Sequence, residues 1–163
     1  MTSSADATVQ RFFSYVVKGP ELTSCWLWVG AIGDDGYGRF WVKEPGDKQR
    51  VYRAHRWALE HAQPVERPQQ FHALHRCDNP LCVRATSGED SHLYWGTKSQ
   101  NMMDRSARGR SNFQLLGKPD PEARGKRVKA AQALRDYTKA HGYEQVKVDE
   151  LMKNVLPDQG TLF

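Results

Sequence analysis

The chain has little from which to build a disulfide framework or a membrane anchor. It holds three cysteines in 163 residues, and no run of eighteen apolar residues occurs. The first segment, MTSSADATVQRFF, lacks the basic and then apolar pattern of a secretory signal. We therefore expect a cytoplasmic protein, in which cysteines are better explained as metal ligands or free thiols than as disulfides.

What the chain does have is basic charge, unevenly distributed. The formal net charge is +5, and residues 105–128 hold seven Lys or Arg against two acidic residues. This charge permits a polyanionic partner without requiring one. A second basic set is interleaved with Tyr37, Phe40, Trp41 and Tyr52, and it consists of Arg39, Lys43, Lys48, Arg50 and Arg53.

Apolar spacing and turn residues predict a mixed α+β protein. We expect helices over 8–18, from His55, over 98–109 with Ser99 as N-cap and Gly109 as stop, over 121–142 and over 146–154. Strands are expected over 25–31, after a turn within 33–43, and from Gln49 up to the helix near His55, and together they suggest a twisted antiparallel sheet whose basic, aromatic surface fits a DNA groove. Another strand is expected over 71–77. The expected division is a domain over 1–110, a linker over 111–121, a basic helical region over 122–156 and a tail over 157–163.

The stretch LHRCDNPLCVRATSGEDSHLYWGTKSQN (74–101) concentrates residues with ligand chemistry. Cys77 and Cys82 have four residues between them, and His92 follows across a loop. With Cys25, the remaining cysteine, they form a Cys₃His set suited to a tetrahedral structural zinc. The alternative is that these cysteines are small buried hydrophobes. His55 is a rival fourth ligand, although we favour a packed or hydrogen-bonded structural role for it.

His75 and Asn101 do not fit the same ion easily. On a strand, the His75 imidazole can activate water, and the amide oxygen of Asn101 on the next helix is a hard ligand suited to Mg²⁺ or Mn²⁺. Together they could frame a phosphate, with the ion stabilising the departing oxygen. Taken alone, a histidine beside a strand is more often a hydrogen-bonded structural residue.

Several separated motifs carry a resemblance. They are His-x-Cys-x4-Cys, then His-Leu-x-Trp, then an asparagine nine residues after that histidine, with CWLWVGA, GYGRF and AHRW upstream and SQNMMDRSARGR downstream. Over about residues 10–112 the chain resembles the HNH endonucleases of phages and mobile elements, and closely their zinc-bearing relatives, the His-Cys box homing endonucleases.

The resemblance implies a ββα-metal (HNH or His-Me finger) nuclease module with an antiparallel DNA-binding sheet, a structural zinc and a helical C-terminal tail. It implies that His75 is the general base, that Asn101 holds a catalytic divalent ion, and that Cys25, Cys77, Cys82 and His92 hold the zinc. Leu74 stands where many relatives have a second ligand, and the loop RATSGEDSHL is longer and more acidic than theirs. Asp78 could substitute as that ligand, but nothing in the sequence favours it.

A nuclease of this kind also needs cations on the phosphate. Arg50 is our first candidate for the cation that neutralises the phosphate in the transition state, and Arg39 is the second. Either could instead simply bind the DNA backbone. The DNA-binding residues we expect are Arg39, Lys43, Lys48, Arg50, Arg53, Arg105, Arg108 and Arg110. The final QGTLF resembles peptides that dock on bacterial sliding clamps, with Gln159, Leu162 and Phe163 as the contacts.

The leading hypothesis is therefore a metal-dependent DNA endonuclease that nicks or cuts double-stranded DNA in a bacterial or phage-infected cell. A type II restriction enzyme built on the same module is a close alternative. The non-enzymatic alternative is a zinc-stabilised DNA-binding protein with an inactive nuclease fold. The spacing of a two-Cys, two-His zinc finger is absent.

Overall fold

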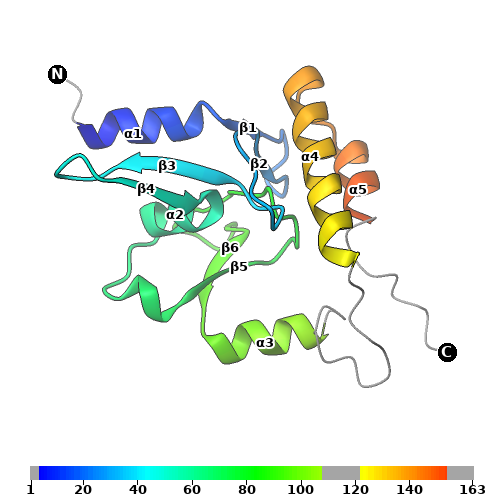
Figure 1. Ribbon diagram of the computed structural model, residues 1–163. Coiled ribbons are helices and arrows are strands. Elements are labelled where there is room, and N and C mark those ends of the chain that lie inside the picture. The colour runs from blue at the N-terminus through cyan, green and yellow to red at the C-terminus, as the bar shows by residue number, and fades with distance from the viewer. Residues whose placement is uncertain (1–3, 108–121, 154–163) are drawn as a thin grey trace.

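A computed structural model of the protein describes residues 4–107 and 122–153. It is a mixed α+β structure, as expected (Figure 1). In chain order the elements are α1 (Ser4–Phe13), β1 (Val16–Lys18), β2 (Trp26–Trp28), β3 (Arg39–Lys43), β4 (Gln49–Arg53), α2 (Ala54–Ala62), a 3₁₀ turn (Pro68–Gln70), β5 (His72–His75), β6 (Leu93–Gly96), α3 (Lys98–Ala107), α4 (Ala123–His141) and α5 (Gln145–Lys153).

The described strands form three separate two-stranded antiparallel sheets, β1–β2, β3–β4 and β5–β6, and the expectation of one continuous sheet was wrong. The short strands leave room for only a few backbone pairs in each ladder, such as His72 opposite Gly96 and His75 opposite Leu93. Each pair gains its stability from what covers it, because an isolated two-stranded sheet is marginal in water.

The first helix is shorter than expected and ends at Phe13, so the predicted helix over 8–18 was wrong in its second half. Val16 and Val17 instead pair with Trp28 and Leu27 in β1–β2. Both valines are β-branched, and such residues pack better on a pleated surface than in a helix. The tertiary pairing therefore overrides the helical spacing of the apolar residues.

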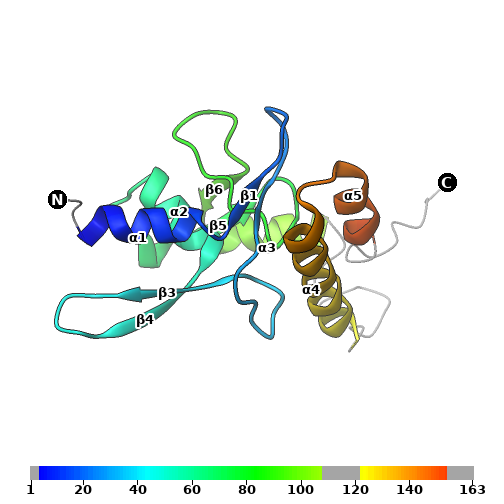
Figure 2. The same cartoon turned by 90° about the horizontal axis from the view of Figure 1, so that it is seen from above.

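The β3–β4 hairpin carries the basic, aromatic surface. Phe40, Val42 and Tyr52 face the core, while Arg39, Trp41 and Arg53 face outward, where 53% of Trp41 remains exposed. Its tip turns through Gly46 and Asp47, both at positive φ. In both ribbon views the tip lies on the opposite side of the molecule from α4 and α5 (Figures 1 and 2).

Two buried clusters hold the elements together. The first is largely aromatic, and its buried members are Phe12, Trp28, Phe40, Ala54, Ala58, Leu59, Val83 and Leu93. The second joins β2 and the loop after β5 to the C-terminal helices through Cys25, Leu27, Leu81, Cys82, Ala131, Leu134 and Val148. The C-terminal helices are therefore packed onto the rest of the fold.

The ends of α4 follow the sequence signals. The helix ends at His141, and Gly142 follows with φ 84°, a conformation that glycine adopts without strain. No helix among residues 4–107 and 122–153 is long and apolar enough to cross a bilayer.

Candidate metal centre and adjoining cavity

The three cysteines and His92 come together in one cluster, as the spacing predicted. Their ligand atoms all lie within 4.8 Å of one another. The His92 Nδ1 lies 3.6 Å from the Cys25 Sγ and 3.5 Å from the Cys82 Sγ. Zn–S and Zn–N bonds of about 2.3 and 2.0 Å at tetrahedral angles place sulfur and nitrogen about 3.5 Å apart. The cluster can therefore bind a metal such as zinc.

The thiols are already arranged to share negative charge. Hydrogen bonds with Cys25 and Cys82 hold the pKa of Cys77 far below that of a free thiol. Burial raises the pKa of Cys82, and the hydrogen bond to Cys77 raises that of Cys25. Three thiols this close cannot all ionise without repelling one another. A bound cation removes this repulsion by taking the place of their protons, because the thiolate is the form that binds metal.

The loop that brings His92 to the cluster is organised by Arg84, which the sequence reasoning missed. Arg84 is 3% exposed and donates to the Ser24 carbonyl at 2.8 Å, the Asp90 carbonyl at 3.0 Å and the Asp90 carboxylate at 3.0 Å. The Thr86 hydroxyl also donates to Asp90, at 2.6 Å. These bonds fix the path of the loop that leads from Cys82 to His92. An arginine followed six residues later by an aspartate was its one sequence signal.

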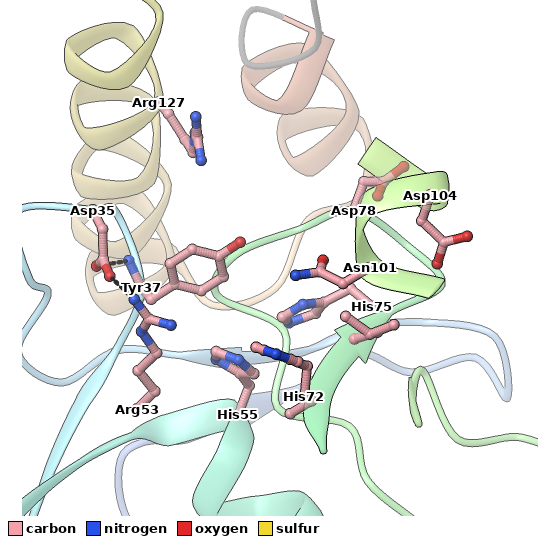
Figure 3. Close-up of a pocket in the computed structure, with 12 residues that line it drawn as sticks. Asp35, Tyr37, Arg53, His55, His72, His75, Asp78, Asn101, Asp104 and Arg127 are labelled. Carbon is pink, nitrogen blue, oxygen red and sulfur yellow. Dashed lines mark hydrogen bonds and ion pairs between the residues drawn. The ribbon is translucent and has the colours of Figure 1, made fainter. Parts of the chain in front are cut away.

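A polar cavity of about 290 Å³ adjoins the metal centre (Figure 3). It brings together residues from β4, α2, β5, α3, α4, the loop before β3 and the loop after β5. The polar residues that line it are Asp35, Tyr37, Arg53, His55, His72, His75, Asp78, Asn101, Asp104 and Arg127. His75 and Asn101, which the sequence analysis paired as residues that could frame a phosphate, thus line the same cavity.

His75 is held by the metal-binding loop. Its Nε2 lies 3.0 Å from the carbonyl oxygen of Cys82, and because a carbonyl only accepts, this nitrogen carries the proton. In the neutral ring Nδ1 is then the basic nitrogen. The backbone of one metal-binding residue therefore fixes the tautomer and the orientation of the His75 ring.

His55 lies against His75 and away from the thiols. Its ring centroid is 4.7 Å from that of His75 and 5.0 Å from that of Tyr37. Burial, with His75 and nearby arginines, lowers the pKa of His55 well below its ordinary value, so the ring is neutral. Its Nδ1 has no hydrogen-bond partner among the described residues. The structure brings His92, and not His55, to the metal cluster.

Asn101 is positioned by the start of α3. Thr97 caps this helix, and the expected N-cap Ser99 was wrong. The Thr97 amide donates to the Gln100 side chain at 2.8 Å, and the Gln100 amide donates to the Thr97 hydroxyl at 3.2 Å. This reciprocal pair is a capping box, which satisfies two backbone amides at once and was readable from Thr-x-x-Gln. One turn after Asn101, Asp104 accepts from the Tyr94 hydroxyl at 2.5 Å, which ties α3 to β6.

The arginines are arranged differently from the prediction. Arg50 is not among the residues that line the cavity; its guanidinium lies over the Tyr52 ring and 3.5 Å from the Glu44 carboxylate. Arg53 does line the cavity, and it is bound to Asp35 at 2.8 Å. Arg39 binds the same carboxylate at 2.9 Å.

Asp35 is thus the acceptor for both arginines. Burial opposes its charge, but the hydrogen bonds from Arg39 and the Tyr37 amide, and the charges of Arg39 and Arg53, lower the pKa of Asp35 below its ordinary value. Of the other expected DNA-binding residues, Lys43 pairs with Asp47 at 2.7 Å. Lys48 lies exposed directly before β4, and Arg105 is within α3. Arg108, Arg110, Gln159, Leu162 and Phe163 lie outside the described residues.

Comparison with known proteins gives two relatives, both from Escherichia phage T7. The chain is 36% identical to Protein 2.8 over 90 residues, which are 55% of this chain and 55% of the relative. It is 32% identical to Protein 7.7 over 90 residues, or 55% of this chain and 60% of the relative. The chain thus matches little more than half the length of each relative. No family model matches it, and no solved structure does.

Proposed function

We propose that this protein is a metal-dependent endonuclease that hydrolyses phosphodiester bonds in double-stranded DNA. The observation that carries the proposal is that His75 and Asn101 line the same cavity beside the metal centre. They reach it from the end of β5 and the first half of α3. The order β5, loop, β6, α3 matches the ββα arrangement that the resemblance implies, and it supports that finer description of the fold.

In this proposal His75 takes a proton from a water molecule aligned with the scissile bond. The Cys82 carbonyl accepts a hydrogen bond from the His75 Nε2, so Nδ1 is the nitrogen that can act as the base. Burial of His55 against the other side of the imidazole limits how the ring can turn. Both contacts pre-orient the His75 ring, which lowers the cost of reaching the reactive geometry.

The cavity also offers oxygen ligands suited to a hard divalent ion. The Asn101 side-chain amide makes no hydrogen bond with the described residues, and Asp104 lies one helical turn further along the same cavity. Asp78, two residues before Pro80, also lines it. When bound, Mg²⁺ or Mn²⁺ supplies charge stabilisation to the phosphate and to the leaving 3′ oxygen. The zinc at the thiol cluster has a structural role only in this proposal.

The β3–β4 hairpin is the proposed DNA-contacting ribbon. Its outward face presents Arg39, Trp41, Lys43 and Arg53, and this face ends at the cavity through Arg53. A two-stranded ribbon fits the major groove. The two relatives belong to a phage, which supports a role in a phage-infected cell.

The test is the conversion of supercoiled plasmid to nicked and linear forms with Mg²⁺ or Mn²⁺. Wild type is compared with His75→Ala and with His61→Ala, a control at an exposed histidine that stacks on Trp57 and is not among the residues lining the cavity. Losing the general base is expected to lower the rate about 10²–10⁴-fold, whereas His61→Ala retains cutting. All three proteins should contain equal zinc and melt alike.

The outcomes separate the alternatives. Accumulated nicked circle indicates a nickase, whereas direct linearisation indicates paired cutting by a restriction or homing enzyme. Equal cutting by wild type and a folded His75→Ala would contradict the assignment of the base. Tight binding to many DNA sequences with no cutting under any divalent ion would favour the zinc-stabilised DNA-binding protein.

A further inference from the structure

One wall of the cavity comes from outside the β5–β6–α3 unit. Arg127, near the start of α4, lines the cavity together with His75 and Asn101. In Figure 3 its side chain extends from α4 on the side opposite His55 and His72. A helix that follows α3 by more than a dozen residues thus supplies a cation to the proposed catalytic site.

The position of Arg127 is fixed by its neighbours along α4. Ala131 and Leu134 are buried in the second cluster, beside Leu27, Leu81 and Cys82. These apolar contacts hold the middle of the helix against the loop of the metal centre. The helix therefore cannot move away from the cavity without exposing buried apolar surface to water.

The N-terminal part of α4 lies beside the loop before β3, and an exposed ion pair joins the two. Arg124 donates to the backbone carbonyl of Asp34 at 3.0 Å and to its carboxylate at 2.5 Å. Gly36, at φ 84°, lies against Arg127, because a Cβ added there would be 3.5 Å from the Arg127 Cγ. The stem of Arg127 thus rests on the loop that carries Asp35 and Tyr37, and its guanidinium reaches the cavity.

Within the described structure, the Arg127 guanidinium forms no ion pair with an acidic side chain. Of the two arginines that line the cavity, Arg53 is bound to Asp35, whereas Arg127 has no acidic partner among residues 4–107 and 122–153. Arg127 is also only partly exposed. A fixed guanidinium that lacks a carboxylate is suited to a phosphate, which it can bind through two parallel hydrogen bonds.

We propose that Arg127 binds a phosphate of the DNA strand that lies in this cavity. The substrate site is then completed by the C-terminal helix α4 and is not confined to the β5–β6–α3 unit. The inference rests on the proposed function for the identity of the ligand, a DNA phosphate. The contact itself rests on the position and the charge of Arg127.

The test compares Arg127→Gln, Arg127→Lys and Arg124→Gln with wild type. Arg124→Gln is the matched control, since it removes the same charge from the same helix three residues away. Its partner Asp34 is not among the residues that line the cavity, and an exposed ion pair contributes little, so the buried Ala131 and Leu134 keep α4 in place. Removing a donor that acts on the reacting phosphate is expected to lower plasmid nicking about tenfold to a hundredfold in Arg127→Gln. Arg127→Lys should recover part of the loss, because it keeps the charge and loses the planar fork. Arg124→Gln should stay near wild type.

A second measurement separates this inference from the proposed function. Binding of a short DNA duplex is followed without added Mg²⁺ or Mn²⁺ over a range of salt concentrations, where no cutting is expected, and without a chelator, which would remove the structural zinc. Removing one phosphate contact is expected to reduce the salt slope by about 1 in Arg127→Gln, and not in Arg124→Gln. If wild type binds DNA without cutting it and this difference persists, the phosphate contact stands while the nuclease proposal fails. If Arg127→Gln and Arg124→Gln behave alike in both assays, the inference is overturned.

Discussion

The Cys₃His cluster and the cavity are neighbours, but their polar groups are arranged differently: those of the cluster face one another, and those of the cavity surround an open space. In the cluster, four ligands face one another within 4.8 Å, and Cys25 and Cys82 are buried. In the cavity, polar groups from seven parts of the chain line a space of about 290 Å³. The first arrangement is typical of a closed structural metal site, and the second of a site that admits a ligand. The Cys82 carbonyl joins them, because it accepts from His75.

Removing the metal centre should have the largest effect. Structural zinc contributes about 10–16 kcal/mol of apparent binding energy in zinc-finger peptides, comparable to the total stability of a domain, about 5–15 kcal/mol. His92→Ala is therefore expected to lose stoichiometric zinc and the cooperative unfolding transition. Zinc content and thermal melting measure this.

The control for His92 is another imidazole outside both sites. His61 stacks on Trp57, with ring centroids 5.3 Å apart, and is exposed. His61→Ala should keep the zinc and melt close to wild type. A His92→Ala protein that retained both zinc and the wild-type melting temperature would show that this cluster is not the structural metal centre.

Replacing Asp35, which lines the cavity, should have a smaller effect on stability, and one that depends on pH. Its carboxylate accepts from Arg39 at 2.9 Å and from Arg53 at 2.8 Å, and its pKa in the folded protein is lowered. The stabilisation it provides is therefore present above the pKa of the unfolded chain and is lost as pH falls through the folded pKa. Asp35→Asn should lower the free energy of unfolding by about 1–2 kcal/mol near neutral pH.

The pH dependence distinguishes lost charge pairing from lost packing. The difference in free energy of unfolding between wild type and Asp35→Asn should shrink toward zero in strong acid, where both side chains are neutral. Denaturant melts at a series of pH values measure it. A difference that stays constant down to the lowest pH would show that the carboxylate charge is not what stabilises this loop.

The two regions also differ in how far they could be predicted. The clustering of Cys25, Cys77, Cys82 and His92 could be predicted from the scarcity of cysteine and the loop-sized spacing of Cys77 and Cys82, because residues that share one ion must lie together in the fold. The cavity was predicted only at His75 and Asn101. Arg53 and Arg127 reach it through tertiary packing, and no local pattern marks an arginine that will face a cavity.

The fold shows the same division between local and tertiary causes. Helix α4 was predictable, since Gly142 ends it by a backbone conformation that needs no partner. The helix over 8–18 was not, because Val16 and Val17 pair with a strand that lies ten residues further on. The N-cap of α3 was readable but was assigned to Ser99, two residues past the Thr97–Gln100 capping box.

The smallest expected effect concerns two arginines of one strand. Arg50 and Arg53 both lie on β4, but only Arg53 lines the cavity. If both contact DNA phosphates, each Gln substitution should reduce the salt slope of duplex binding by about 1. Only Arg53→Gln should also slow cutting at saturating DNA, because its guanidinium is within the site where the phosphate reacts. An equal loss of cutting rate in Arg50→Gln would show that the transition-state cation need not line the cavity. Unchanged salt slopes in both variants would show that the hairpin does not bind DNA.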